Sequence, residues 1–436
     1  ATIAPGTDGT VGTLTTGDLA LSDNSILAFD LGAPDSETGS DLIQVNGDLT
    51  LDGMLNASDA GGFGIGVYRL INYTGTLTDN GLMVDTLPEG FSVEQGSIQV
   101  TAQGQVNLII DRAIPAIQFW DGSDAEGDGT IDGGSGSWNL ADTNWTDANG
   151  EFNAGWNENF AVFGGAAGGT VTVDDAITFS GLQFVTDGYT LAVGSGGLTI
   201  SDNATAVRLD PGLSATIAAS IAGAGGLNKL DEGTLTLEGD NTYTGETVVD
   251  GGLLVVNGSL ASSVIVNVGG SLGGTGTTGG LAVTGTLAPG NSIGTLNVGG
   301  NLVFDAGSTL EIEVNPGGAS DLVNATGDVT IDGGTVSVLT SSTLFNFSTD
   351  YTIVTAGGDL DGQFDDVITD LAFLTPILDY TDNSVLLTLR RNDVDFAAIG
   401  QTANQIATGA AVESAGNGEL GNSIINLDAA TARNAF

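Results

Sequence analysis

Two glycine-rich runs in the sequence have the spacing of known chemical motifs. The run Gly269–Gly273 places Ser271 at the centre of a Gly-x-Ser-x-Gly pattern, the turn that exposes a nucleophilic serine. The run Gly274–Gly279 has the Gly-x-Gly-x-x-Gly spacing that cradles a dinucleotide. The first motif needs a base and a strand-to-helix turn, but the chain has no histidine. The second needs a following helix, but it leads into the predicted strand Leu281–Leu287, so both runs are predicted to be structural.

Charged residues offer two further candidate sites. Lys229 is the only lysine, so a Ser-Lys dyad would have to use it, but it lies at a corner of a repeat, where a solvated or strand-flanking cation is expected. The acids Asp124, Glu126 and Asp128 have the spacing with which an EF-hand loop begins. Position twelve of that loop is Ser135 instead of glutamate, so we expect an acidic surface loop. The sequence therefore predicts no catalytic, cofactor-binding or metal-binding residues.

Composition limits the fold and the partners. The 436 residues include 70 glycines, only 8 prolines and 41% hydrophobic residues, which indicates a folded chain rich in turns. The 54 acidic and 7 basic residues give a net charge of -47, so nucleic acid and anionic membrane surfaces are poor partners. The absence of cysteine excludes disulfides, thiolate metal sites and cysteine nucleophiles.

Short strands between glycine corners are the elements that would position any site. Within Gly225–Gly258, the alternating run Thr234–Leu237 and the apolar run Leu253–Val256 are each short and bounded by glycines. Each fits one face of a β-solenoid coil and is too short for a helix. The stretch resembles the passenger-associated transport repeat of bacterial autotransporters, except that Asp231 stands where the repeat has the first glycine after its lysine, with Leu230 as that glycine's neighbour.

An internal duplication organises the chain, and repeats of this kind determine the fold. Three runs of the N-terminal part recur near the C-terminus: Thr2–Gly6 as Thr286–Gly290, Gly47–Gly53 as Gly327–Gly333, and Tyr68–Ile71 as Tyr351–Val354. In the later copy, Pro289 fixes φ and Gly290 permits a positive φ, which predicts a tight corner between two strands. This copy resembles the autochaperone region of autotransporter passengers. The resemblance implies a cap that folds first and templates the rest.

Between the two copies lies an aromatic segment. It contains all four tryptophans of the chain, at positions Trp120, Trp138, Trp145 and Trp156. Clustered aromatic rings can line a carbohydrate or partner site. We favour the alternative that these large side chains seal the open end of a solenoid that restarts after a break.

After Asn392 the spacing of the apolar residues changes to a helical period, which predicts helices. Two runs have helical spacing: Phe396, Ile399, Ala403, Ile406, Ala407 and Ala410, then Leu420, Ile424, Leu427 and Ala430. Asp393 to Phe396 is expected to form the cap and first turn. By resemblance, this helix is the linker that leads into the C-terminal β-barrel translocator of the same precursor, and the chain is expected to be a piece of a longer passenger.

These observations predict an all-β, parallel β-helix with a short C-terminal helical linker; its right hand comes from the resemblance. Five segments are expected: 1–115, first autochaperone-like module; 116–224, Trp-containing solenoid; 225–285, transport repeat; 286–392, C-terminal autochaperone-like module; and 393–436, linker.

The resemblance implies a non-enzymatic, structural or adhesive passenger fragment, displayed on or released from the surface of a Gram-negative bacterium. Its expected partners are the translocator barrel, further copies of itself or a host or surface ligand, and no nucleic acid. The alternatives are a secreted, polysaccharide-acting β-helical enzyme, which would use paired carboxylates, and a Ca2+-dependent adhesion repeat protein.

Overall fold

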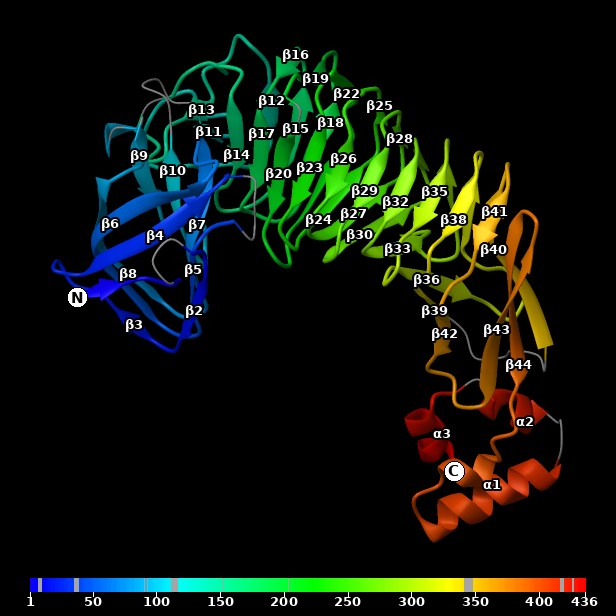
Figure 1. Cartoon of the computed structure of the whole chain (residues 1–436). Helices are drawn as coiled ribbons and strands as arrows, with labels where there is room; N and C mark the ends of the chain where they lie inside the picture. Colours follow the sequence, from blue (N-terminus) through cyan, green and yellow to red (C-terminus); the bar gives the residue numbers. More distant parts are fainter. Residues whose placement is uncertain are drawn as a thin grey trace. The chain divides into compact units, whose positions relative to one another are not determined.

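The computed structural model describes residues 1–6, 10–34, 39–89, 91, 93–110, 117–151, 153–202, 204–340, 348–415, 419–425 and 427–436. Its contacts divide the chain into two compact units, Ala1–Gly233 and Thr234–Phe436. This division lies inside the segment 225–285 that was expected from the sequence. Within each unit, short parallel strands stack in successive rungs (Figure 1), which confirms the predicted parallel β-helix.

The first unit begins with residues 1–110, which we call the first module. One of its sheets has the order β1 (Thr2–Ile3), β4 (Ile26–Gly32), β6 (Leu49–Gly61) and β3 (Leu19–Ala20), and β8 (Leu77–Thr86) also pairs with β6. The other has the order β2 (Thr13–Thr16), β5 (Leu42–Val45), β7 (Gly66–Tyr73), β10 (Gln105–Ile110) and β9 (Gly96–Gln99), with the 3-10 turn η1 (Val93–Gln95) before β9. The rungs are parallel, whereas β10 is antiparallel to both β7 and β9.

Residues 117–233, which we call the Trp block, complete the first unit. One face has the order β13 (Trp145–Thr146), β11 (Ile117–Trp120), β14 (Phe160–Phe163), β17 (Gly181–Phe184), β20 (Thr205–Leu209) and β23 (Leu227–Leu230). A second has β12 (Gly136–Trp138), β15 (Thr170–Val173), β18 (Tyr189–Val193) and β21 (Ser214–Ile217). The third has β16 (Ala176–Thr178), β19 (Gly197–Ile200) and β22 (Ile221–Gly223).

The second unit continues the same design. One face has β26 (Thr247–Val249), β29 (Val264–Val266), β32 (Leu281–Val283), β35 (Leu302–Phe304), β38 (Val329–Ile331) and β41 (Leu360–Gly362). A second has β24 (Thr234–Leu237), β27 (Gly252–Val256), β30 (Gly270–Gly274), β33 (Thr286–Pro289), β36 (Thr309–Val314), β39 (Thr335–Thr340) and β42 (Asp366–Thr369). The third has β25 (Asp240–Asn241), β28 (Ser259–Leu260), β31 (Thr277–Thr278), β34 (Thr295–Val298), β37 (Leu322–Ala325), β40 (Ser348–Ala356), β44 (Ser384–Arg391) and β43 (Leu374–Thr381).

Alternation along strands such as β24 explains why these segments stack. In β24, Leu235 and Leu237 are fully buried, while the threonines before each of them are half-buried on the outer side. The register places Leu235 beside Leu254 and Leu237 beside Val256 of the next rung. A single rung cannot bury its inner face, so the apolar core forms only when rungs stack.

Strand pairing shows the internal duplication directly. Thr13 pairs with Leu42 in the first module, and Thr295 pairs with Leu322 in residues 286–391, which we call the second copy. In the first module β7, β10 and β9 form an antiparallel cap on the last rung; in the second copy β40, β44 and β43 form the same cap. Both copies are therefore short stacks of parallel rungs closed by an antiparallel cap.

A buried carboxylate ties the rungs together in each copy. Asp41 accepts hydrogen bonds from the backbone N–H of Gly12 at 2.7 Å and of Asp30 at 2.9 Å. Asp321 accepts the equivalent bonds from Gly294 at 2.8 Å and Glu313 at 2.7 Å. Burial raises the pKa of both carboxyls, that of Asp321 to about 6, although the N–H donors oppose this rise.

The predicted corner at Pro289–Gly290 is present in the second copy. Gly290 has a φ of +89°, a left-handed conformation that glycine adopts without steric cost.

The C-terminal helices are shorter than the sequence indicated. Phe396–Ile399 forms the 3-10 turn η2, whose N-cap residue Asp395 makes no side-chain capping bond. Gly400 then adopts an extended conformation, so α1 begins only at Ala403 and spans Ala403–Ala415. The second predicted helix is split into α2 (Glu419–Ile424) and α3 (Ala429–Ala435), because Asp428 is extended and caps α3. None of the helices in the described ranges is long and apolar enough to cross a membrane.

Candidate functional site: a charged junction in the first unit

The glycine-rich motifs lie in rungs of the β-helix. Ser271 is the second residue of β30, a strand that pairs in parallel with both neighbouring rungs. The Gly274–Gly279 run passes through the short strand β31 and continues to β32. Neither run is followed by a helix, so neither has the local geometry that its chemistry requires.

The acidic loop uses its carboxylates to hold its own turns. Asp124 accepts the Glu126 N–H at 3.0 Å, and Asp128 accepts the Thr130 N–H at 2.9 Å. The hydroxyl and N–H of Thr130 lower the pKa of Asp128. Within the described ranges, no group of three or more acidic side chains is arranged to hold a metal ion.

The tryptophans form an interior cluster. Trp120, Trp138 and Trp145 have no exposed surface, and Trp156 is 7% exposed. The ring centroids of Trp145 and Trp156 are 4.5 Å apart, and those of Trp120 and Trp145 are 5.2 Å apart. Because no ring face is open to solvent, the cluster is part of the core where the Trp block begins, as the sealing interpretation requires, and is not a binding platform.

The basic residues instead reveal a site. Of the seven cations, Arg112 lies outside the described residues, whereas Arg69, Arg208 and Lys229 gather in the first unit. Lys229 is fully buried, so the expectation that it is solvated is wrong. Its Nζ donates to the carbonyl oxygens of Leu230 at 2.9 Å and Asp231 at 2.7 Å.

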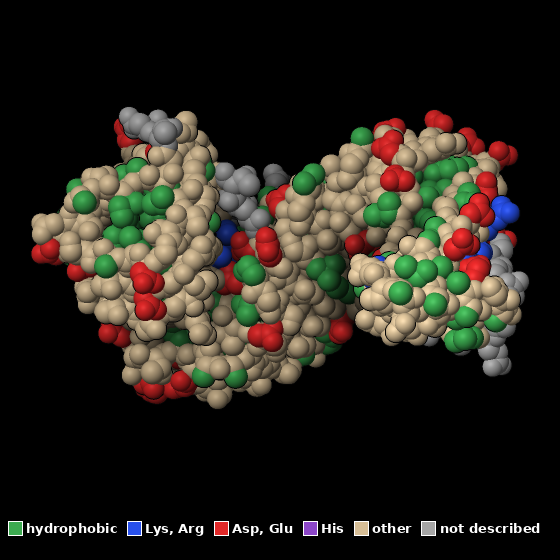
Figure 2. All heavy atoms as spheres, turned by 90° about the horizontal axis from the view of Figure 1, so that it is seen from below, with side chains coloured by type: hydrophobic (Ala, Val, Ile, Leu, Met, Phe, Trp, Pro, Cys, Tyr) green, Lys and Arg blue, Asp and Glu red, His purple; other side chains and the backbone are tan. Residues whose placement is uncertain are grey.

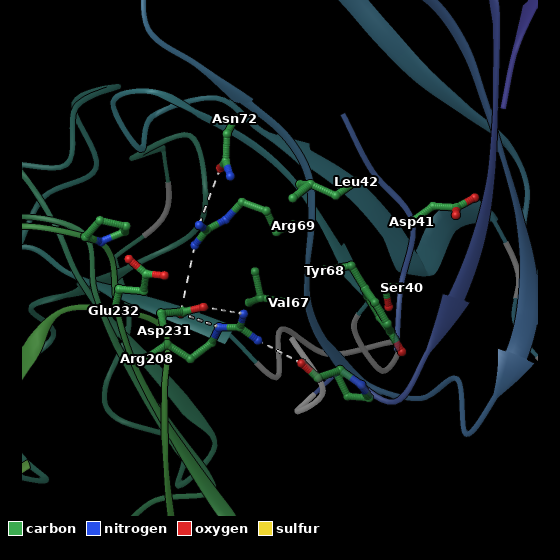
Figure 3. A pocket seen from close by; sticks show the side chains of 12 residues that line it. Ser40, Asp41, Leu42, Val67, Tyr68, Arg69, Asn72, Arg208, Asp231 and Glu232 are labelled. Carbon is green, nitrogen blue, oxygen red and sulfur yellow. Dashed lines mark hydrogen bonds and ion pairs between the residues drawn. The ribbon is translucent and has the colours of Figure 1, made fainter. Parts of the chain in front are cut away.

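Two arginines converge on Asp231, as Figure 3 shows. Arg208 Nε and Nη2 each lie 3.1 Å from the Asp231 carboxylate, a bidentate pair, and Arg208 Nη1 donates to the carbonyl of Pro34 at 2.8 Å. Arg69, on β7 of the first module, pairs with Asp210 and lies 3.9 Å from Asp231. These contacts join the first module to the Trp block; we call Arg69, Arg208, Asp210 and Asp231 the charged junction.

The junction is largely removed from water. The side chains of Arg208 and Asp231 are 7% and 9% exposed, and those of Arg69 and Asp210 are 14% and 10% exposed. Burial raises the pKa of Asp210, and the neighbouring Arg69 partly offsets the rise. Pairs this buried are costly to break, because the remaining partner becomes an uncompensated charge.

Asp231 also has an unusual backbone conformation. Its φ is +61°, in the left-handed region that favours glycine, and the transport repeat has a glycine at this place. Aspartate is one of the few other residues that tolerate this conformation. The sequence therefore keeps a carboxylate where glycine would fit with less strain, and its two arginine partners explain why.

Two cavities border the junction. The first has a volume of about 220 Å3 and is lined by the junction arginines, Asp231 and Tyr68. The second has a volume of about 480 Å3, and Asn159, Thr178, Ser180, Ser201 and Asp202 give it a polar wall. Glu158, another of its lining residues, has a left-handed φ of +65°. Only the second cavity is within the usual size range of ligand pockets, roughly 300–1,000 Å3.

Sequence reasoning did not identify the junction. Arg69 and Asp210 are 141 positions apart, so no local motif links them. Two signals were nevertheless present: the scarcity of cations, which makes each one informative, and the aspartate in the place of a repeat glycine.

Comparisons with known proteins agree with the fold. The model of the passenger-associated-transport-repeat family matches residues 227–256. The chain is 40% identical over 295 residues to the adhesin BmaC autotransporter of Brucella suis biovar 1 (strain 1330), covering 63% of this chain and 8% of that protein. Two extracellular serine proteases of Serratia marcescens are 38% and 35% identical over 204 and 205 residues; each match covers 44% of this chain, and 19% and 20% of those proteins.

The chain thus spans no more than a fifth of the length of these curated relatives. The resemblance between Gly225 and Gly258 is confirmed by the family match, and the parallel β-helix is consistent with it. The family match and these relatives support the assignment of the chain to an autotransporter passenger domain.

Proposed function

We propose that this segment is a β-helical stalk with an adhesive role, and that its second copy is an autochaperone cap that templates folding during secretion across the outer membrane. As part of a passenger it is exposed at the cell surface or outside the cell. The observation that carries the template role is the antiparallel cap of β40, β44 and β43. The cap closes one edge of the last rung and leaves the opposite edge to pair with earlier rungs. The C-terminal helices would connect this cap to the translocator barrel of the same precursor.

Two equivalent leucines allow the template role to be tested. Leu387 of β44 lies opposite Tyr351, and Leu108 of β10 lies opposite Tyr68; both leucines are fully buried. If the second copy folds first, Leu387→Ala slows the recovery of Trp fluorescence about tenfold after dilution from urea, although all the tryptophans belong to the other unit. Leu108→Ala, the matched control, mainly speeds unfolding. A wild-type refolding rate in Leu387→Ala would contradict the template role.

We place the adhesive contact at the 480 Å3 cavity beside the charged junction. Its hydroxyl, amide and carboxylate groups suit a ligand rich in hydroxyl groups, and Asp202 is exposed at its wall. Binding of the intact chain to a glycan array is the direct test. A bound glycan should be lost with Asp202→Ala and retained with Asp147→Ala, a half-buried aspartate outside the cavity lining; equal loss in both variants would exclude this location.

We further propose that the segment itself is not catalytic, although two of its relatives are named serine proteases. The support is the lack of histidine and cysteine together with the position of Ser271 inside a rung. Hydrolysis of casein or of a fluorogenic peptide by the purified chain, abolished by Ser271→Ala, would refute this.

A further inference from the structure

The polar wall of the 480 Å3 cavity is one corner of three stacked rungs. Its lining residues directly precede three neighbouring strands: Glu158 and Asn159 precede β14, Phe179 and Ser180 precede β17, and Ser201, Asp202 and Ala204 precede β20. The register pairs Phe160 with Gly181 and Gly181 with Ala206, so these corners follow one another along the stack. Neighbouring strands lie about 4.8 Å apart, which separates the first corner from the third by roughly 10 Å. A ligand that reaches both of them must be extended.

The two ends of this wall carry carboxylates that have no partner within the described ranges. Glu158 and Asp202 are exposed, and no hydrogen bond or ion pair joins either carboxylate to another described residue. Arg208 also lines the cavity, but Asp231 balances its charge in the bidentate pair. The cavity therefore presents a net negative charge. Figure 2 shows acidic side chains spread over the visible face of the molecule, in keeping with the net charge of -47, and such a field attracts cations.

The rest of the wall is neutral. Ser180 and Ser201 carry hydroxyl groups, which can both donate and accept hydrogen bonds, and Asn159 carries an amide. Phe160 and Phe179 also line the cavity, so part of its surface is apolar. This arrangement suits an extended chain of hydroxyl-rich units that carries positive charge at two places.

We propose that this cavity binds an oligosaccharide of amino sugars with unsubstituted amino groups, which places one ammonium group at Glu158 and another at Asp202. The proposal rests on the proposed adhesive role of the cavity and names the class of its ligand. An acidic glycan would bring like charges against both carboxylates, and an N-acetylated glycan has no charge to pair with them. A metal ion is the poorer occupant, because no group of three or more acidic side chains in the described ranges is arranged to hold one.

Four compounds separate these possibilities in calorimetric titrations of the intact chain at about pH 6, where amino groups are protonated. Three are oligosaccharides of equal length: a glucosamine oligomer, the same oligomer fully N-acetylated, and a glucuronic acid oligomer. The fourth is spermine, a linear polyamine without hydroxyl groups. We expect the glucosamine oligomer to bind at one site, at least about tenfold more tightly than each of the other three compounds.

Substitutions of similar shape test the two carboxylates. Glu158→Gln and Asp202→Asn should each weaken binding of the glucosamine oligomer about tenfold. Glu151→Gln, at an exposed position of the same block outside the cavity lining, should leave binding unchanged. Glu158→Gly should weaken binding as much as Glu158→Gln and yet raise the midpoint of urea unfolding, because glycine adopts the φ of +65° without strain. Loss of binding is thereby separated from loss of folding.

Contrary results would be distinguishable from one another. Tighter binding of the N-acetylated or the glucuronic acid oligomer, lost in Asp202→Asn, would overturn the amino-sugar proposal and leave the adhesive role of the cavity standing. If none of the three oligosaccharides binds, the amino-sugar proposal is overturned, and the glycan array decides the adhesive role separately. Spermine that binds as tightly as the glucosamine oligomer would show that charge alone is recognised, and an equal loss in Glu151→Gln would show attraction by the net charge of the chain. Either result would overturn the proposal.

Discussion

For the variant Asp231→Gly, the repeat consensus and the structure predict opposite changes in stability. This change restores the residue of the transport repeat and relieves a left-handed φ of +61°, so repeat consensus predicts a gain of about 1 kcal/mol. The structure predicts a loss instead. Without Asp231, the Arg208 guanidinium, whose side chain is 7% exposed, is left as an uncompensated charge. That costs about 3–5 kcal/mol, which leaves a net destabilisation of about 2–4 kcal/mol.

Trp fluorescence in a urea titration measures this effect where it occurs. All four tryptophans lie in the Trp block, which contains Asp231, so their signal reports on the first unit. The loss corresponds to a midpoint lower by about 1 M or more. Glu232→Gly, the exposed neighbour with the same change of charge, is the control and should change stability by less than about 0.5 kcal/mol.

A double variant shows whether the uncompensated charge of Arg208 causes the loss of stability. Adding Arg208→Met to Asp231→Gly removes the uncompensated guanidinium and keeps an apolar side chain of similar length. We expect it to recover at least about 1 kcal/mol. An Asp231→Gly midpoint equal to or above that of the wild type would refute the account of the charged junction.

Three further outcomes follow from the structure. Burial raises the pKa of Asp321 to about 6, so the folded state favours the protonated carboxyl group. The stabilising contribution of this group is fully present below about pH 4 and is lost as the pH rises through about 6. Relative to Asp321→Asn, the wild type should therefore gain protection against hydrogen exchange around Glu313 between pH 7 and pH 5; a constant difference would contradict this. Trp145→Ala should destabilise the first unit by about 3–5 kcal/mol in calorimetry, and a loss below about 1 kcal/mol would mean that the cluster is not core. Chelation of Ca2+ should leave the melting temperature unchanged, because Asp124 and Asp128 already bond within their loop; a lower melting temperature would point to a bound ion.

The sequence predicts the rungs well because their determinants are local. Alternating residues such as Leu235 and Leu237, bounded by glycines, define a strand and its inner face without reference to any distant part of the chain. The duplication could also be found from sequence, because it preserved whole turns such as Pro289–Gly290.

The charged junction and the helix ends depend on information that is not local. The pairing of Arg69 with Asp210 depends on how the first module meets the Trp block, and no sequence period encodes that contact. Lys229 is polar and flexible, so composition favoured solvent, yet backbone carbonyls satisfy it in the interior. Helical spacing alone could not show that Gly400 and Asp428 adopt extended conformations, which interrupt the helices.

The antiparallel cap of the first module has a consequence for the history of such chains. Stacked rungs are structurally equivalent, and local unfolding spreads from one rung to the next unless a closed edge interrupts the stack. The cap of β7, β10 and β9 ends one stack at Ile110, and the Trp cluster closes the beginning of the next. Genetic recombination at this boundary would keep the rungs of each stack together, but a new neighbour would have to replace the contacts of Val67 and Ile109 with the Trp block and the partners of the charged junction.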